Sequence, residues 1–179
     1  MSTVAIEVQG APVNGYLAVP DSGSGPGVLV IQEWWGLVPH IRSVVERLAE
    51  SGFVAMAVDH YRGVETTEPD EAQKLMMGMH VDAIAFYPAM PWPDYHPHWT
   101  HYAGKAAIIH KAESDEAHAG PRIAEYAEAI GAAGGKASIF DYPGSEHAFF
   151  NDDRPEVYHA EYAQAAWQRS IDFFDARLR

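Results

Sequence analysis

The chain has 179 residues, a formal net charge of −13 and no cysteine. No run of eighteen apolar residues occurs, which argues against a membrane span, and the acidic balance argues against nucleic-acid binding. The chain can form no disulfide, and its first ten residues lack the basic and apolar segments of a secretory signal. We therefore expect one soluble, cytoplasmic domain over residues 1–179, long enough to bury a core.

The first sixty residues predict several strands and one helix. The apolar run at 27–33 indicates a parallel strand buried on both faces, and Gly52 stands where a left-handed residue ends a helix. The expected elements are a hairpin of 4–9 and 15–19 with its turn at 12–15, a surface loop at 21–27, a strand at 27–33, a helix at 40–51 and a strand at 53–59.

The rest of the chain alternates helices and strands. Expected are a helix at 70–79, a strand at 81–87, an irregular segment at 88–101, a strand at 105–110, a helix at 120–131, a strand at 136–142 and a helix at 156–178. This alternation predicts the α/β class, with a three-layer arrangement of helices on both faces of a mostly parallel sheet.

The segment G-S-E-H-A-F-F at 144–150 carries the clearest chemical signal. It places His147 on a loop after the last expected strand, and Asp115 lies a few residues beyond the preceding strand. These are the positions at which an α/β-hydrolase holds its catalytic base and the acid that orients it. A nucleophile on a G-x-S-x-G or G-x-C-x-G turn should precede them, and the chain has no such turn.

Motifs along nearly the whole chain extend this pattern. They are V-L-V-I-Q-E-W-W-G-L at 28–37, H-I-R at 40–42, R-L-A-E-S-G-F-V-A at 47–55, D-H-Y-R-G at 59–63, P-D-E-A-Q-K-L-M-M at 69–77, V-D-A-I-A-F-Y-P at 81–88 and G-S-E-H-A-F-F-N-D-D-R-P-E-V-Y at 144–158. In these motifs the chain resembles the dienelactone hydrolase family of the α/β-hydrolase superfamily. The resemblance implies that His147 is the catalytic histidine, Asp115 the triad acid and Glu33 the active-site glutamate that interacts with the family's nucleophile.

The chain departs from the family between Met77 and Val81. Only Gly78, Met79 and His80 stand where the family has a long helix, a central strand, the nucleophile elbow and the following helix. The loss amounts to on the order of 50 residues if a strand–elbow–helix unit is absent. The resemblance therefore predicts a sheet reduced by one central strand and its helices. A smaller departure is Ala112, where the family usually has glycine.

Each candidate catalytic residue has a structural alternative. His147 could be an inherited loop histidine, and Asp115 could be an acidic residue at a helix start. Glu33 ends a buried strand beside two tryptophans, where a carboxylate is costly unless it is paired or protonated; it suits acid–base work or a salt bridge with Arg42 or Arg62. Ser114 and Ser145 neighbour the acid and the base, and we interpret both as loop hydroxyls rather than replacement nucleophiles.

Candidate substrate-binding residues are aromatic or cationic. Arg154 could hold a substrate carboxylate through two hydrogen bonds, or it could be a solvated surface arginine. Aromatic side chains could line a pocket or pack in the core, namely Trp34, Trp35, Tyr61, Tyr87, Trp92 and Trp99. His96, His98 and His101 do not form a known zinc signature, and we expect no metal and no cofactor.

The sequence leaves three functions open. The first is an enzyme acting on a small carboxylated lactone or enol-type substrate, in which His147 or Glu33 activates water or moves a proton without a covalent intermediate. Hydrolysis, isomerisation and cyclisation would all be possible. The second is an inactive family member that binds a ligand or partner, and the third is an assembly role. Because the loss of a central strand uncovers apolar strands, we also expect a homodimer or higher homo-oligomer.

Overall fold

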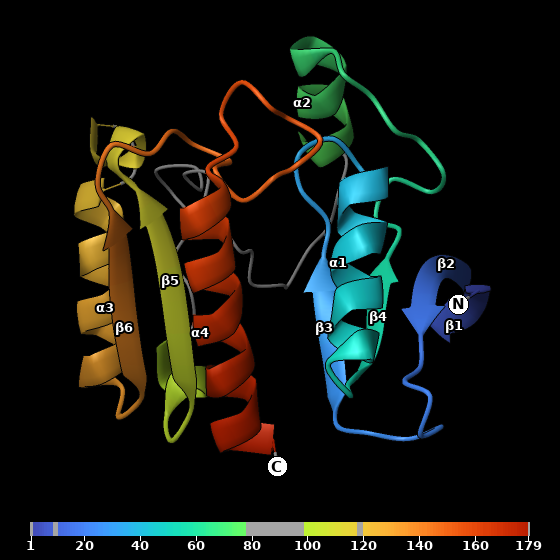
Figure 1. Cartoon of the computed structure of the whole chain (residues 1–179), viewed down its shortest axis with the longest axis horizontal. Coiled ribbons are helices and arrows are strands. Elements are labelled where there is room, and N and C mark those ends of the chain that lie inside the picture. Colours follow the sequence, from blue (N-terminus) through green and yellow to red (C-terminus); the bar gives the residue numbers. More distant parts are fainter. Residues whose placement is uncertain (1, 9–10, 78–98, 118–119, 179) are drawn as a thin grey trace. The chain divides into compact units, whose positions relative to one another are not determined.

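A computed structural model describes residues 2–8, 11–77, 99–117 and 120–178 (Figure 1). The chain divides into two compact units, Met1–Ile84 with Leu178–Arg179, and Ala85–Arg177. Each contains strands and helices, which confirms the α/β class. The single domain expected over residues 1–179 stays a prediction. The strand expected at 81–87 and most of the segment expected at 88–101, with Tyr87, Trp92, His96 and His98, lie outside the described residues.

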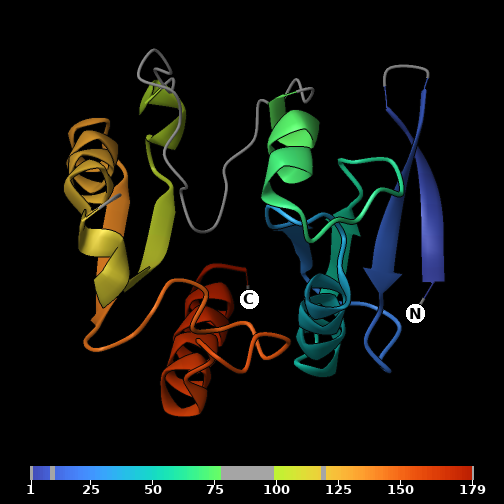
Figure 2. The same ribbon diagram turned by 90° about the horizontal axis from the view of Figure 1, so that it is seen from above.

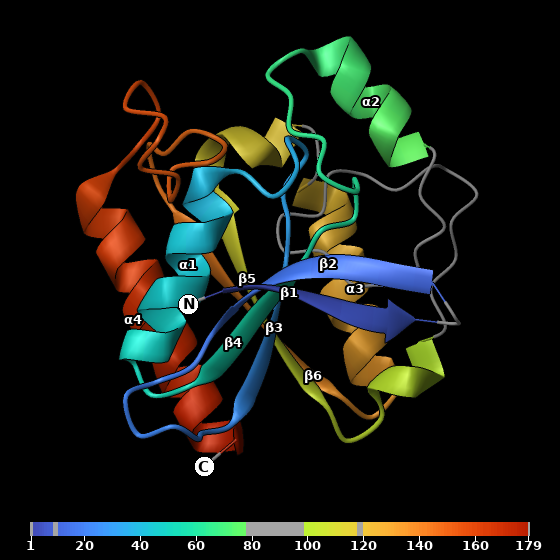
Figure 3. The same ribbon diagram turned by 90° about the vertical axis from the view of Figure 1, so that its right-hand side faces the viewer.

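The first unit is built on a four-stranded sheet in the order β1-β2-β4-β3, in which β3 is Gly27–Ile31 and β4 is Val54–Val58. Strands β1 (Ser2–Val8) and β2 (Ala11–Ala18) form an antiparallel hairpin, visible side by side in Figure 3. The turn expected at 12–15 is wrong, because Pro12 and Gly15 pair with Glu7 and Val4 inside this hairpin. Of the residues of β2, only Gly15–Ala18 pair with β4. Pro12 therefore lies where β2 has β1 as its single neighbour, and its missing N–H is tolerated there.

Helix α1 (Pro39–Glu50) covers one face of this sheet (Figure 1). It starts with Pro39, whose fixed φ suits a first helical residue, and it ends in a Schellman motif. Gly52, at φ 90°, donates its N–H to Ala49 O, and Phe53 donates to Leu48 O. The predicted stop at Gly52 is therefore confirmed. Helix α2 (Pro69–Met77) follows β4 in the chain.

The parallel pair of β3 (Gly27–Ile31) and β4 (Val54–Val58) places the two strand ends at one edge of the sheet. Ala55 and Ala57 of β4 are small and fully buried, and α1 packs against β4. The expectation that the 27–33 strand is buried on both faces is wrong for its middle, where Leu29 remains 57% exposed. An apolar run predicts a strand, but its burial depends on which elements cover it.

The second unit contains a parallel pair, β5 (Ala106–Ala112) and β6 (Lys136–Tyr142). Helix α3 (Gly120–Ala132) lies on one side of this pair and helix α4 (Ala160–Leu178) on the other (Figures 1 and 2). Two short 3₁₀ helices, η1 (Trp99–Tyr102) and η2 (Glu113–Ala117), precede and follow β5. The C-terminal helix was expected from residue 156 and begins at Ala160, because residues 151–159 form a turn-rich segment instead.

Helix α4 is fixed to the strands by a small core and a polar network. Tyr142, Phe149, Ala112 and Ala166 form the buried cluster. Beside it, His110 Nδ1 lies 2.7 Å from Tyr142 Oη, and His110 Nε2 lies 3.1 Å from Ser170 Oγ of α4. Burial first, and the Arg169 cation second, lower the pKa of His110 from 6.5 to about 4.

No helix in the described part of the chain combines the length and the apolar character needed to cross a bilayer.

Candidate active site

Two loops at the same end of the β5–β6 pair carry the predicted base and acid. The parallel register aligns Ala112 with Tyr142, so the segments that follow the two strands leave the sheet together. Asp115 lies in η2 after β5, and His147 lies in the loop after β6. Adjacent parallel strands thus bring together two residues that are 32 positions apart in the sequence.

His147 and Asp115 form the contact expected of a base and its orienting acid. His147 Nδ1 lies 2.7 Å from Asp115 Oδ1, and the second oxygen, Asp115 Oδ2, accepts the Ala112 N–H at 3.1 Å. An ionised carboxylate only accepts hydrogen bonds, so Nδ1 carries the proton and Nε2 of the neutral ring keeps its lone pair. The Asp115 side chain is 13% exposed and the His147 side chain 57%, which leaves the imidazole open to solvent. This arrangement can accept a proton from water.

The loop that carries His147 is anchored in the core. Phe149 is fully buried and packs on Tyr142 with ring centroids 4.6 Å apart. Ala148, directly after His147, is buried and adopts a left-handed φ of 67°, a conformation that costs a residue with a Cβ about 1 kcal/mol. The buried phenylalanine and the left-handed turn together hold His147 at the surface.

The two serines near this pair are occupied by loop hydrogen bonds. Ser145 is buried, and its hydroxyl donates to Tyr142 O at 2.7 Å. Ser114 Oγ accepts the backbone N–H of His147 at 2.7 Å. Both contacts are those of loop hydroxyls.

Glu33 and the neighbouring tryptophans lie in the first unit, after β3. Glu33 and Gly36 form an isolated β-bridge, and Gly36 donates its N–H to Glu33 O at 3.3 Å. Tyr61 Oη donates to Trp34 O at 3.2 Å, and burial raises the pKa of the Tyr61 phenol. The loops after β3 and β4 are therefore bound to each other. Their catalytic or binding roles stay predictions.

The cationic candidates in both units have acidic partners. Arg42 Nη2 pairs with Glu65 Oε1 at 2.6 Å. Arg154 Nε donates to Glu156 Oε1 at 3.1 Å, and the Arg154 side chain is 37% exposed. Arg154 is thus an accessible guanidinium with one edge held by a carboxylate.

Trp99, a candidate for a pocket wall, contacts other aromatic rings. Its ring centroid lies 5.1 Å from that of Tyr126 in α3 and 5.9 Å from that of Tyr102. These contacts agree with its packing interpretation. Within the described residues, no cluster of three side chains of the types that hold metals is present.

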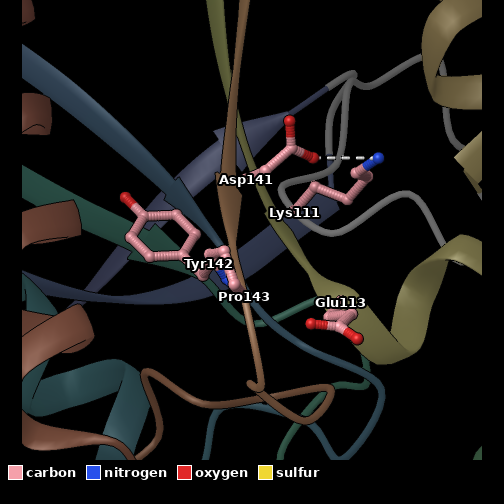
Figure 4. Close-up of a pocket in the computed structure, with 5 residues that line it drawn as sticks. All are labelled: Lys111, Glu113, Asp141, Tyr142 and Pro143. Carbon is pink, nitrogen blue, oxygen red and sulfur yellow. Dashed lines mark ion pairs between the residues drawn. The ribbon is translucent and has the colours of Figure 1, made fainter.

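An open hollow lies at the ends of β5 and β6 (Figure 4). Lys111, Glu113, Asp141, Tyr142 and Pro143 line it, and Lys111 Nζ pairs with Asp141 Oδ1 at 2.9 Å. Glu113 also accepts the Gly144 N–H at 2.5 Å, which links the hollow to the His147 loop. Glu113 was not among the residues predicted from the sequence. Its position two residues before the candidate acid could have indicated that it lies near the His147 loop.

The sequence is similar to proteins of one known family. The sequence matches the dienelactone hydrolase family over residues 13–83 and 81–178, so the match breaks at 81–83. Protein usf of Aquifex pyrophilus is 31% identical, and the alignment covers 98% of each chain. A relative from Aquifex aeolicus, named "Putative carboxymethylenebutenolidase", is 28% identical over 98% of both chains.

The alignment with protein usf extends over 227 positions against 179 residues in this chain, which leaves at least 48 positions without a counterpart here. A solved structure described as a dienelactone hydrolase-like promiscuous phosphotriesterase from metagenomic libraries superposes with a TM-score of 0.74 at 13% identity. That superposition covers 98% of this chain and 97% of the other, and it shows a shared fold. Family membership supports a hydrolase-like function, and by its match over most of its length the chain belongs to the dienelactone hydrolase family.

Proposed function

We propose that this chain is a hydrolase-like enzyme that acts on a small carboxylated lactone or enol-type substrate, with His147 as general base. The observation that carries the proposal is the 2.7 Å contact between His147 Nδ1 and Asp115 Oδ1 beneath a solvent-exposed imidazole. Asp115 fixes the tautomer and stabilises the imidazolium that forms when Nε2 accepts a proton.

In this mechanism water replaces the missing covalent nucleophile. His147 Nε2 takes a proton from water as the water oxygen attacks the lactone carbonyl, which gives a tetrahedral oxyanion. The oxyanion then collapses, the ring C–O bond breaks, and the imidazolium returns its proton to the leaving oxygen. An enol lactone suits this route, because its leaving group is a stabilised enolate rather than an alkoxide.

Three observations support a mechanism without an elbow nucleophile. The chain has no cysteine. The family match is divided at 81–83, directly after residues 78–80, where the nucleophile elbow is expected to be lost. The hydroxyls of Ser114 and Ser145 are engaged by the backbone of their own loops. Water activation by the remaining base is the chemistry that these residues support.

Two observations favour a substrate that carries a carboxylate. The name of the Aquifex aeolicus relative refers to a carboxymethylenebutenolide, which is an unsaturated lactone with a carboxylate. Arg154 is partly exposed, and Glu156 holds the Nε edge of its guanidinium, so the Nη groups can donate to a substrate carboxylate. We propose Arg154 as the carboxylate-binding residue.

Glu33 is the second proposed acid–base residue, and Trp34, Trp35, Tyr61 and Tyr87 are the proposed substrate-binding residues. The backbone contact between Glu33 and Gly36 and the hydrogen bond from Tyr61 to Trp34 support a well-defined loop at this position. A Glu33→Gln variant tests the role of the carboxylate independently of His147, because it changes the ionisable group and leaves the side-chain size nearly constant.

Hydrolysis of carboxymethylenebutenolide and of simple phenyl esters, followed in ¹⁸O-labelled water, tests the proposal. Wild type should turn over the lactone with ¹⁸O in the product carboxylate, and His147→Asn should reduce kcat/KM by about 10²–10⁴-fold. His159→Asn, a change in the same unit outside the proposed base and acid, is the matched control. Turnover without ¹⁸O would indicate isomerisation or cyclisation by direct proton transfer. Full activity of His147→Asn would refute the proposed base.

A catalytically inactive family member that binds a ligand or partner, or has an assembly role, is the second candidate. The absence of cysteine together with two engaged serine hydroxyls favours it, since covalent catalysis needs a free nucleophile. Calorimetric binding of the lactone with no turnover above the buffer rate would select a ligand-binding role.

A further inference from the structure

Three consecutive residues after β5 each contact the loop that carries His147. Glu113 Oε2 accepts the Gly144 N–H at 2.5 Å. Ser114 Oγ accepts the His147 N–H at 2.7 Å, and Ser114 N–H donates to Ser145 O at 3.2 Å. Asp115 Oδ1 contacts His147 Nδ1 at 2.7 Å. The 113–115 segment is therefore bound to the 144–147 loop at four points.

Some of these contacts fix the imidazole ring of His147, and others fix the position of its backbone. Asp115 fixes the orientation of the imidazole, but the ring also depends on the position of its own Cα. Ser114 holds the backbone N–H of His147 itself, and Glu113 holds the start of the loop at Gly144, where the chain turns through a left-handed φ of 74°. These two anchors act on the backbone on the N-terminal side of His147, and buried Phe149 anchors the loop on the C-terminal side.

We propose that Ser114 and Glu113 are positioning residues that hold His147 in the orientation in which Asp115 fixes its Nδ1–H tautomer. The catalytic consequence rests on the proposed function, whereas the effect on the imidazole does not. Ser114 acts as a hydrogen-bond acceptor in this role, which is distinct from that of a nucleophile. A shift of the base by about 1 Å can cost up to 10²-fold in rate, so such anchors matter for proton transfer.

The chain offers variants that separate this role from simple loop packing. Ser114→Ala removes the acceptor of the His147 N–H, and Ser114→Thr restores an Oγ at the same position. Glu113→Gln keeps an oxygen acceptor for Gly144 but removes its charge. Ser22→Ala is the matched control, because it removes the same hydroxyl group from an exposed loop of the first unit, where Ser22 Oγ donates to Ser24 O at 2.9 Å.

Two readouts on the full chain test the proposal. The first is the signal of the His147 Nδ1 proton, which is hydrogen-bonded to Asp115, in NMR spectra of imidazole-labelled protein. The second is kcat/KM for the lactone. Ser114→Ala should broaden or remove the Nδ1 proton signal and lower kcat/KM by about tenfold, the equivalent of one hydrogen bond. Ser114→Thr and Ser22→Ala should retain the wild-type signal and rate. The signal and kcat/KM of Glu113→Gln should lie between those of Ser114→Ala and wild type.

A Ser114→Ala protein with the wild-type Nδ1 signal would overturn the proposal, as would a Ser114→Thr protein that loses the signal equally. If Ser114→Ala does not fold, the comparison of Glu113→Gln with wild type decides in the same way, and an unchanged signal counts against the proposal. If wild type proves inactive on all substrates, the proposed function fails, yet the NMR comparison still decides whether Ser114 and Glu113 position His147.

Discussion

Protonation of His110 should weaken the folded state at mildly acidic pH. Ser170 Oγ has one hydrogen, which it donates to Ala166 O at 2.9 Å, so it must accept a hydrogen bond from His110 Nε2. His110 Nδ1 then lacks a proton and accepts from Tyr142 Oη, which in turn accepts from Arg169 Nη1 at 2.8 Å. A second proton on His110 would meet the Tyr142 hydroxyl hydrogen and lie near the Arg169 cation.

The size of this effect follows from the pKa of His110, which is lowered from 6.5 to about 4. Between these values the unfolded chain binds a proton that the folded chain excludes, so stability falls as the pH falls through this window. At about 1.4 kcal/mol per pH unit, the whole window is worth about 3 kcal/mol, and acidification from pH 7.5 to 5 removes about 2 kcal/mol.

Urea unfolding of wild type and His110→Phe at pH 7.5 and pH 5 measures this directly. Phenylalanine fills the site but cannot titrate. It leaves the Tyr142 hydroxyl without its acceptor, so the variant should be less stable at pH 7.5 by about 1–3 kcal/mol. Between pH 7.5 and 5, wild type should lose about 2 kcal/mol more than His110→Phe. Equal losses in the two proteins would refute the assigned network.

Four further outcomes are expected. Arg169→Gln should raise the pKa of His110, measured by NMR titration, because it removes the nearby cation. Gly36→Ala should lower the unfolding free energy by about 2 kcal/mol or more in urea melts, since its Cβ would lie 2.6 Å from Val64 O at a φ of 101°. Intact-mass analysis after treatment with a serine-reactive phosphonate should show no stoichiometric adduct, and labelling of one serine would reveal a nucleophile. Light scattering should give a mass above that of the 19.7 kDa monomer at micromolar concentration, and a monomer mass would contradict the expected homo-oligomer.

Local signals along the chain determined most of the secondary structure. Gly52 ends α1 because only a left-handed residue completes its Schellman motif, and Gly134 at φ 84° ends α3 in the same way. The strand at 136–142 matches β6 (Lys136–Tyr142), because a short run with β-branched and aromatic residues, bounded by Gly and Pro, is a strong strand signal. The motifs around Glu33 and His147 sufficed to identify the family, which the match over the chain confirms.

Features that depend on distant partners required the tertiary structure. The hairpin turn at 12–15 was misplaced because strand pairing, rather than the local Pro and Gly residues, decides where a hairpin turns. The exposure of Leu29 depends on what covers β3, which a sequence pattern does not record. Asp115 could be expected to meet His147 from strand order alone, but the anchors at Glu113 and Ser114 depend on the loop conformations after β5 and β6. The network of His110, Tyr142, Arg169 and Ser170 joins residues up to 60 positions apart, so only packing of α4 against the strands creates it.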